Sequence, residues 1–229
     1  MVVMRHALRL DEVDDDFVSS SKAWWDPPLA PKGFDQAAHT AETHLRSLDL
    51  QVLVTSPFKR CLQTANTALE SMPTCCKRMH INCKLCEMLT ARNLNFHDRP
   101  LPNGHIQEWM WNGSSIDAAL KLALLSDNFI IDDSDLPAFP ETAELAHARI
   151  NVALEAIGNQ YMGKNILVVA HGEAVNRSVV RLMPWTNVID AQHCSAQSAS
   201  PKLIMLRTTF VLVKQFTPEI DIVLKADAG

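Results

Sequence analysis

The sequence lacks any apolar run approaching the roughly 20 residues that a membrane-spanning helix needs. Its start also lacks the basic stretch and long apolar segment of a secretory signal. With 26 acidic against 21 basic residues the formal net charge is −5, so the basic excess typical of nucleic-acid binders is missing. These absences predict a soluble, cytoplasmic protein without nucleic-acid or membrane partners, in which any anion binding is local.

The six cysteines show neither a zinc pattern nor a disulfide framework. Residues 75–86 contain four of them together with His80, but no second C-x-x-C pair follows. Within this stretch, residues 79–85 alternate between apolar and polar types, which predicts a half-buried strand with Cys83 inside. We therefore expect thiols, with no metal bound.

Strand-like and helix-like segments alternate along the 229 residues, 47% of which are hydrophobic. Short apolar runs predict strands at 2–4, 51–55, 79–85 and 165–170, and apolar residues at helical spacing predict helices at 38–48, 57–72, 141–161 and 173–183. Residues 208–225 read as two further strands at a sheet edge. The alternation predicts a three-layer α/β/α sandwich with a mainly parallel central sheet, in one domain spanning residues 1–229.

Residues 90–140 differ in character from the rest of the chain. They contain several prolines, Trp109, Trp111 and an acidic D-D-S-D stretch around one helical segment near 116–125. This composition predicts an insertion or lid over the core rather than a separate domain. Together with residues 11–25, its aromatic side chains are candidates for the rim of a pocket that suits a large ligand.

Side chains that can bind anions or take part in catalysis lie shortly after four of the predicted strands. They are Arg5 and His6, Ser56 with Arg60, Glu87, and His171. Each alone has an ordinary explanation, since a histidine after a strand is usually a surface or capping group. Because parallel strands meet at one edge with their carboxyl ends, we expect these side chains to converge.

The Ser56-Pro57 dipeptide predicts the start of a helix, with serine as the cap and proline in the first position. Arg60 then lies in the first turn, where unpaired backbone N–H groups favour an anion. Guanidinium groups bind phosphate through forked donors, and a neutral imidazole can attack phosphorus while a carboxylic acid protonates the leaving oxygen. This chemistry requires neither a metal nor another cofactor.

Four motifs, V-V-M-R-H-A, T-S-P-F-K-R-C-L-Q-T-A, C-E-M-L and V-V-A-H-G-E-A-V, resemble those of the histidine phosphatase superfamily of phosphoglycerate mutase-like proteins, branch 1. They occur in the family's order over most of the chain. The resemblance implies His6 as the phosphorylated nucleophile and Glu87 as the proton donor. It also implies Arg5, Arg60 and His171 as the rest of the phosphate pocket.

Within that superfamily the segment R-H-A-L-R-L-D, followed by P-P-L-A-P-K-G-F-D-Q-A, is most similar to the TULA-like phosphatases. This implies Arg9 as an additional pocket arginine, with Asp11 as the acid after it. Ala7 stands where glycine is commonest, and Leu8 stands where glutamate is frequent. The extension typical of the mutases is absent.

We therefore expect a metal-independent phosphomonoester hydrolase without a cofactor. Its predicted catalytic residues are His6, Glu87 and His171, and its predicted phosphate-binding residues are Arg5, His6, Arg9, Arg60 and His171. The expected substrate is a phosphorylated small molecule or a phosphoprotein, and the β-rich end of the chain is a candidate homodimer contact. Two alternatives stay open: a mutase-like phosphotransferase, and a catalytically idle scaffold that binds phosphorylated ligands.

Overall fold

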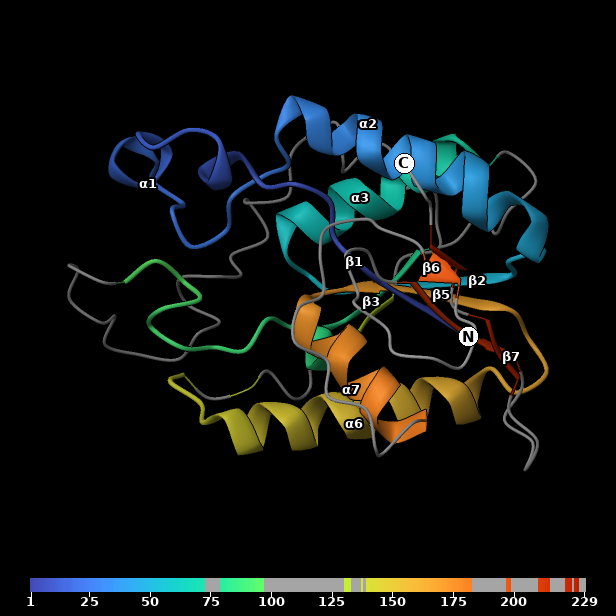
Figure 1. Ribbon diagram of the computed structural model, residues 1–229. Coiled ribbons are helices and arrows are strands. Elements are labelled where there is room, and N and C mark those ends of the chain that lie inside the picture. The colour runs from blue at the N-terminus through green and yellow to red at the C-terminus, as the bar shows by residue number, and fades with distance from the viewer. Residues whose placement is uncertain are drawn as a thin grey trace.

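The computed structural model describes residues 1–72, 79–96, 130–132, 137, 139–182, 197–198, 210–214, 221–223 and 225–226 (Figure 1). Trp109, Trp111 and the helical segment predicted near 116–125 lie outside these residues, as do Cys75, Cys76 and Cys194. The prediction of a lid at 90–140 therefore stays a prediction, and so does that of a single domain.

A seven-stranded sheet runs through the middle of the molecule in the order β4-β3-β2-β5-β1-β7-β8. Its parallel strands are β1 (Val2–Arg5), β2 (Val52–Thr55), β3 (Met79–Asn82), β4 (Ile130–Asp132) and β5 (Ile166–Ala170). The antiparallel strands β7 (Phe210–Lys214) and β8 (Asp221–Val223) complete one edge, as the sequence predicts for the end of the chain. Strands β6 (Gln197–Ser198) and β9 (Lys225–Ala226) pair separately.

Helices cover both faces of the sheet, so the three-layer prediction is confirmed (Figure 1). One face carries α2 (Pro31–Thr40) and α3 (Lys59–Glu70), and the other carries α6 (Ala143–Gln160) and α7 (Gly172–Leu182). The short helix α1 (Phe17–Ser20) belongs to the loop after β1. No helix among the described residues combines the length and hydropathy that a membrane crossing requires.

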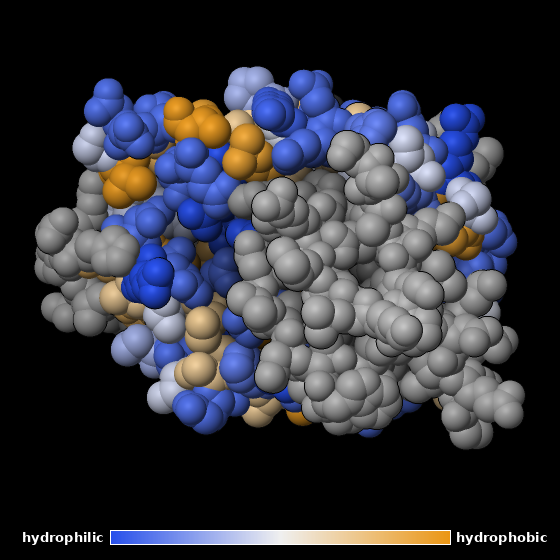
Figure 2. All heavy atoms as spheres, in the orientation of Figure 1, coloured by the Kyte–Doolittle hydropathy of each residue, from blue (hydrophilic) through white to orange (hydrophobic). Residues whose placement is uncertain are grey.

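Buried apolar side chains fill both gaps between the sheet and the helices. Met4 of β1 and Val169 of β5 belong to one core cluster, whereas their neighbours Val3 and Val168 belong to the other. This alternation places a hydrophobic layer on each face of the sheet, which is why the parallel strands read as continuous apolar runs. On the molecular face seen in Figure 2, hydrophilic side chains predominate among the coloured atoms.

Two local predictions were wrong. The strand expected over 79–85 ends at Asn82, because the Asn82 side chain accepts a hydrogen bond from the Lys84 backbone N–H (2.9 Å) and starts a 3-10 turn, Cys83–Leu85. Cys83 is nevertheless fully buried, as predicted. Helix α3 begins at Lys59 with Phe58 as its N-cap residue, so neither Ser56 nor Pro57 has the expected position.

Gly33 in α2 holds the loop after β1 close to that helix. The Leu8 carbonyl accepts a hydrogen bond from Ala30 N–H (2.9 Å), and a Cβ on Gly33 would lie 2.4 Å from the same oxygen. Helical Gly→Ala changes usually stabilise a protein, but here we expect Gly33→Ala to lower the free energy of unfolding by about 1–3 kcal/mol. Urea denaturation measures this effect, with Asp35→Ala at an exposed position of α2 as the control. A gain in stability for Gly33→Ala would contradict the close approach of the Leu8 carbonyl to Gly33.

Candidate active site

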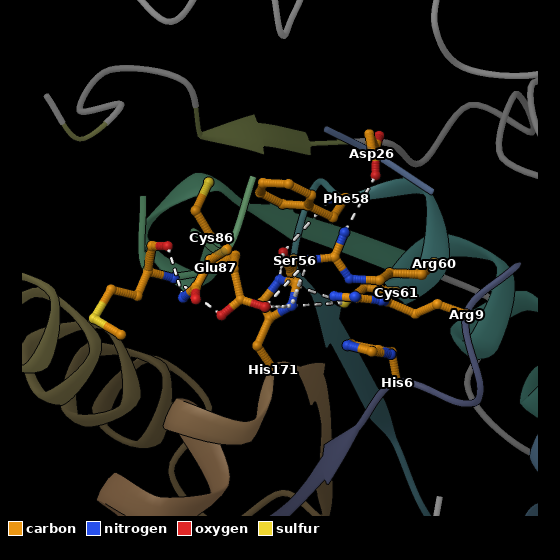
Figure 3. A network of polar contacts seen from close by, with 12 residues as sticks. His6, Arg9, Asp26, Ser56, Phe58, Arg60, Cys61, Cys86, Glu87 and His171 are labelled. Carbon is orange, nitrogen blue, oxygen red and sulfur yellow. Dashed lines mark hydrogen bonds and ion pairs between the residues drawn. The ribbon is translucent and has the colours of Figure 1, made fainter. Parts of the chain in front are cut away.

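Three parallel strands deliver side chains to one edge of the sheet. His6 follows β1 and His171 follows β5, and the pairing of these strands continues past their ends because His6 N–H donates to the Ala170 carbonyl (2.9 Å). Ser56 follows β2, and its N–H donates to the Val169 carbonyl (2.9 Å). The convergence expected at the carboxyl ends of the strands is therefore present (Figure 3).

The two histidine rings lie edge to face. Their centroids are 5.4 Å apart at an interplanar angle of 66°, and both residues are buried. Nδ1 of His6 is 2.8 Å from the Ala7 carbonyl, which accepts only from a protonated ring nitrogen. This contact assigns the hydrogen to Nδ1 and the lone pair to Nε2, the arrangement that a nucleophilic imidazole requires.

Arg60 is fully buried at the start of α3. Its NH2 group donates to Glu87 Oε2 (3.2 Å) and lies 3.3 Å from His171 Nδ1, whereas NH1 is 3.6 Å from Asp26 Oδ1. The guanidinium carbon lies 4.5 Å from the centroid of the Phe58 ring. Nε and NH1 have no hydrogen-bond partner among the described residues, so a buried cation here retains donors that an anion can use.

His171 is held at both ring nitrogens. Nδ1 is 3.2 Å from Glu87 Oε2, and Nε2 is 2.8 Å from Ser56 Oγ. Burial lowers the pKa of His171 to about 4, so the ring is neutral at neutral pH. The neutral form donates from Nδ1 to the carboxylate and accepts the Ser56 hydroxyl proton at Nε2.

Glu87 is a carboxylate in this arrangement. Burial raises its pKa, but His171, Arg60 and the Met88 backbone N–H outweigh burial and hold the pKa well below its usual range. The Met88 N–H donates to Oε1 (3.1 Å), while Arg60 and His171 both approach Oε2. Figure 3 shows the side chains of Arg60, Glu87 and His171 meeting, with His6 beside them.

The two other predicted arginines differ in their surroundings. Arg5 is the last residue of β1, and its charge helps to lower the pKa of His171, so it lies within electrostatic reach of the site. Arg9 donates to both carboxylate oxygens of Asp11 (2.9 Å each) and pairs with Glu12 (3.4 Å). The Arg9 guanidinium therefore binds acids of its own loop, and among the described residues no hydrogen bond or ion pair joins it to Arg60, Glu87 or His171.

Asp26 belongs to the site, although nothing in the sequence around it marks it. The single Lys59 backbone N–H is shared between its two carboxylate oxygens (2.9 and 3.1 Å), and Asp26 approaches Arg60 from the side opposite to Glu87 (Figure 3). Phe58 provides no side-chain cap, so Asp26 caps α3 from a loop that lies 33 residues away in the chain. Burial raises the pKa of Asp26 to about 6, against the opposing effect of Arg60.

The raised pKa predicts a specific dependence of stability on pH. Because the folded-state pKa of about 6 exceeds the ordinary 3.8, the folded protein holds this proton more tightly, and that stabilisation is lost as the pH rises through 6. Asp26→Asn keeps an acceptor for Lys59 but does not titrate. We expect the free energy of unfolding of wild type relative to this variant to fall by about 1 kcal/mol between pH 5 and 6.5.

Urea denaturation at the two pH values measures this difference, with the exposed Asp35→Asn as the matched control. The lowered pKa of His171 makes stability rise with pH in the same range, but wild type and variant share that contribution. A difference between wild type and Asp26→Asn that stays constant with pH would mean that the Asp26 carboxyl group titrates normally.

The ligand atoms of His6, Glu87 and His171 lie within 4.8 Å of one another, a set that in principle can hold a metal ion. The Arg60 guanidinium is within 3.3 Å of two of these three residues, however. A fixed positive charge at that distance opposes a cation and favours an anion. The charges of the site therefore fit a phosphate group better than zinc.

Cys61 adds a thiol to the same cluster. Its Sγ lies 3.6 Å from His171 Nε2 and 3.4 Å from the Ala170 carbonyl. Burial raises the pKa of this thiol, so it remains protonated and is a poor nucleophile. Cys61, Cys83 and Cys86 are all buried, and none of them forms a disulfide with another described residue.

Comparison with known proteins gives one family match. Residues 1–91 match the family described as the histidine phosphatase superfamily (branch 1). Phosphoglycerate mutase-like protein 4 of Arabidopsis thaliana is 26% identical over 165 residues, which are 72% of this chain. The chain spans 64% of the length of that relative.

Solved structures share the fold at low sequence identity. The ecdysone phosphate phosphatase of Bombix mori, in complex with tungstate, matches with a TM-score of 0.60 at 16% identity, over 97% of this chain and 90% of that chain. A putative alpha-ribazole-5'-P phosphatase of Escherichia coli gives 0.57 at 14% identity, over 98% and 96%. The phosphoglycerate mutase of Bacillus anthracis gives 0.53 at 18% identity, over 84% and 83%.

Proposed function

Since these matches support membership of the histidine phosphatase superfamily (branch 1), we propose that the chain is a phosphomonoester hydrolase that works through a phosphohistidine on His6. One observation carries the proposal. A fully buried Arg60, with hydrogen-bond donors that no described residue uses, lies at the strand ends beside two imidazole rings 5.4 Å apart. A positive charge with available hydrogen-bond donors is what stabilises the negative charge of a phosphoryl group.

The reaction has two steps. Nε2 of His6 attacks phosphorus in line, the bond between phosphorus and the leaving oxygen breaks, and protonated Glu87 gives its proton to that oxygen. Water then attacks the phosphohistidine while the Glu87 carboxylate takes a proton, and inorganic phosphate leaves. The cationic groups stabilise the negative charge on the equatorial oxygens in both steps, and no metal is needed in this scheme.

Glu87 must acquire a proton before the first step, although the structure holds it as a carboxylate. A bound phosphate dianion takes over the donors of Arg60 and His171, which otherwise lower the pKa of Glu87. The dianion also brings negative charge beside the Glu87 carboxylate. Both changes raise the pKa of Glu87, so substrate binding itself favours the acid form.

The substrate class follows from the resemblance to TULA-like phosphatases and from the structural neighbour named for ecdysone phosphate. Trp24 and Trp25 pack edge to face (4.8 Å between centroids) in the loop that carries Asp26, and Trp24 also contacts Phe96 (5.8 Å). An aromatic cluster next to the acid that binds Arg60 supports a bulky, apolar leaving group. A phosphorylated small molecule or a phosphotyrosine protein has such a group.

The relative named as phosphoglycerate mutase-like keeps a phosphotransferase as the second candidate. Turnover of para-nitrophenyl phosphate in the presence of a chelator, with and without an excess of a second alcohol, separates the possibilities. We expect release of inorganic phosphate that the chelator does not affect and that the alcohol does not redirect. Transfer to the alcohol would indicate a phosphotransferase, and phosphate-competitive binding without turnover would indicate an idle scaffold.

A further inference from the structure

The backbone that carries Glu87 belongs to no helix or strand. It follows the 3-10 turn Cys83–Leu85 and runs irregularly through residues 86–90. A catalytic acid must be held within a fraction of an ångström of its productive position, so this segment needs support from elsewhere in the fold. The support comes from α6, on the face of the sheet that carries α7.

Arg149 of α6 binds this segment through its carbonyl groups. NH1 donates to the carbonyl oxygens of Lys84 (2.7 Å) and Cys86 (3.1 Å), and NH2 donates to that of Glu87 itself (3.2 Å). The Arg149 side chain is only 10% exposed. Its guanidinium thus takes the place of regular hydrogen bonding for three carbonyl groups within four residues.

Glu141 completes the arrangement from a position two residues before the start of α6. Its carboxylate accepts from Nε of Arg149 (3.2 Å) and pairs with NH2. The same carboxylate accepts the Leu89 N–H (2.8 Å), and the Glu141 N–H donates to the Leu89 carbonyl (3.0 Å). Arg149 and Glu141 together therefore bind the backbone on both sides of Glu87, from residue 84 to residue 89.

We propose that Arg149 and Glu141 are positioning residues that fix Glu87 where its proton reaches the leaving oxygen, an inference that rests on the proposed function. In the part of the chain that the structure describes, neither side chain forms a hydrogen bond or ion pair with His6, Arg60 or His171. The pair therefore acts on proton transfer and not on phosphate binding. This separation distinguishes a positioning role from a general contribution to folding.

Lysine cannot replace Arg149 in this role. A guanidinium presents five donors in a planar fork, whereas an ammonium group is a point charge that cannot bind three carbonyls and a carboxylate in fixed directions. Arg149→Lys keeps the charge and loosens the segment. Glu141→Gln provides a second variant, since it keeps an acceptor for Leu89 while removing the charge that holds the arginine.

The test compares two substrates of similar shape that differ in their need for a proton. The 2,4-dinitrophenolate leaving group departs without protonation, whereas the phenolate of phenyl phosphate benefits from an acid. For Arg149→Lys and Glu141→Gln we expect kcat/KM for phenyl phosphate to fall at least about tenfold more than for 2,4-dinitrophenyl phosphate. The inhibition constant of orthovanadate should change less than about threefold, because the phosphate-binding groups are untouched.

The control for α6 is His147→Ala, which removes the contact with Glu173 (2.9 Å) and leaves the hydrogen bonds of Arg149 and Glu141 in place. It should leave both rates unchanged. Equal losses on the two substrates in the Arg149 and Glu141 variants, or no loss, would overturn the positioning role while leaving the phosphatase intact. If Glu87→Gln itself shows no preference between the substrates, the assignment of the acid fails and this inference fails with it.

Discussion

The His6→Ala variant is expected to form no phosphoenzyme and to lose at least about 10³-fold in turnover. His6 is the ring whose Nδ1 hydrogen bond to the Ala7 carbonyl leaves the lone pair on Nε2. His171 is poorly suited to replace it, because its two nitrogens contact Glu87 and Ser56. Cys61 is equally unsuited, since burial keeps its thiol protonated.

Rapid quenching in alkali after mixing with radiolabelled substrate measures the intermediate, because a phosphohistidine survives base and is lost in acid. Wild type should carry close to one label per chain before steady state, and His6→Ala should carry none. Replacing the exposed His39 of α2 with alanine gives the matched histidine control. Label that persists in His6→Ala would assign the nucleophile to another residue.

Much of the site's geometry was predictable from the sequence because parallel strands impose it. Once β1, β2 and β5 are recognised as buried apolar runs, the residues that follow them must lie at one edge of the sheet, whatever the distance along the chain. His6, Ser56 and His171 are found there for this reason. Glu87 follows β3, which pairs with β2, and reaches the same edge.

The errors arise where the hydrogen bonds of particular side chains override the local structure that a sequence pattern predicts. Ser56 has the chemistry of an N-cap, but its hydroxyl binds His171 and the cap of α3 comes from Asp26. The alternating pattern of 79–85 is that of a strand, yet the Asn82 side chain turns the backbone at Lys84. A sequence pattern reports periodicity and cannot report which loop packs against a helix end.

The supporting residues of the site were missed for the same reason. Asp26, Glu141 and Arg149 act through backbone groups, so no short motif surrounds them. The assignment of Arg9 to the phosphate pocket rests on resemblance alone and stays a prediction. In the structure its guanidinium is bound by Asp11, and this acid also accepts a hydrogen bond from Asn95 (3.1 Å).

Replacing Arg60 should affect substrate binding and turnover together. Its charge is available to the phosphate in the ground state and more strongly to the charge that develops on the equatorial oxygens. For Arg60→Ala we expect KM to rise at least about tenfold and kcat to fall by about 10²-fold or more. Steady-state kinetics with para-nitrophenyl phosphate measure both effects, and an unchanged KM would remove Arg60 from the phosphate site.

The same variant tests the electrostatics of the two carboxylates beside Arg60. Its charge lowers the pKa of both Glu87 and Asp26, so its removal should raise both pKa values and leave two partly buried acids without this cation. Removing one partner of a buried ion pair costs about 3–5 kcal/mol of stability. The variant Arg60→Lys, which keeps the charge, is therefore needed as a control for Arg60→Ala.

We expect Arg60→Lys to fold with nearly normal stability but to remain slow, since one ammonium group cannot reach Glu87 Oε2, Asp26 Oδ1 and a phosphate oxygen together. Urea denaturation and kcat/KM measured on the same samples separate the two effects. If Arg60→Lys restored full activity, the charge of the guanidinium would suffice and its forked geometry would not matter. A stable but slow lysine variant instead identifies directed hydrogen bonding to phosphate as the contribution of this buried arginine.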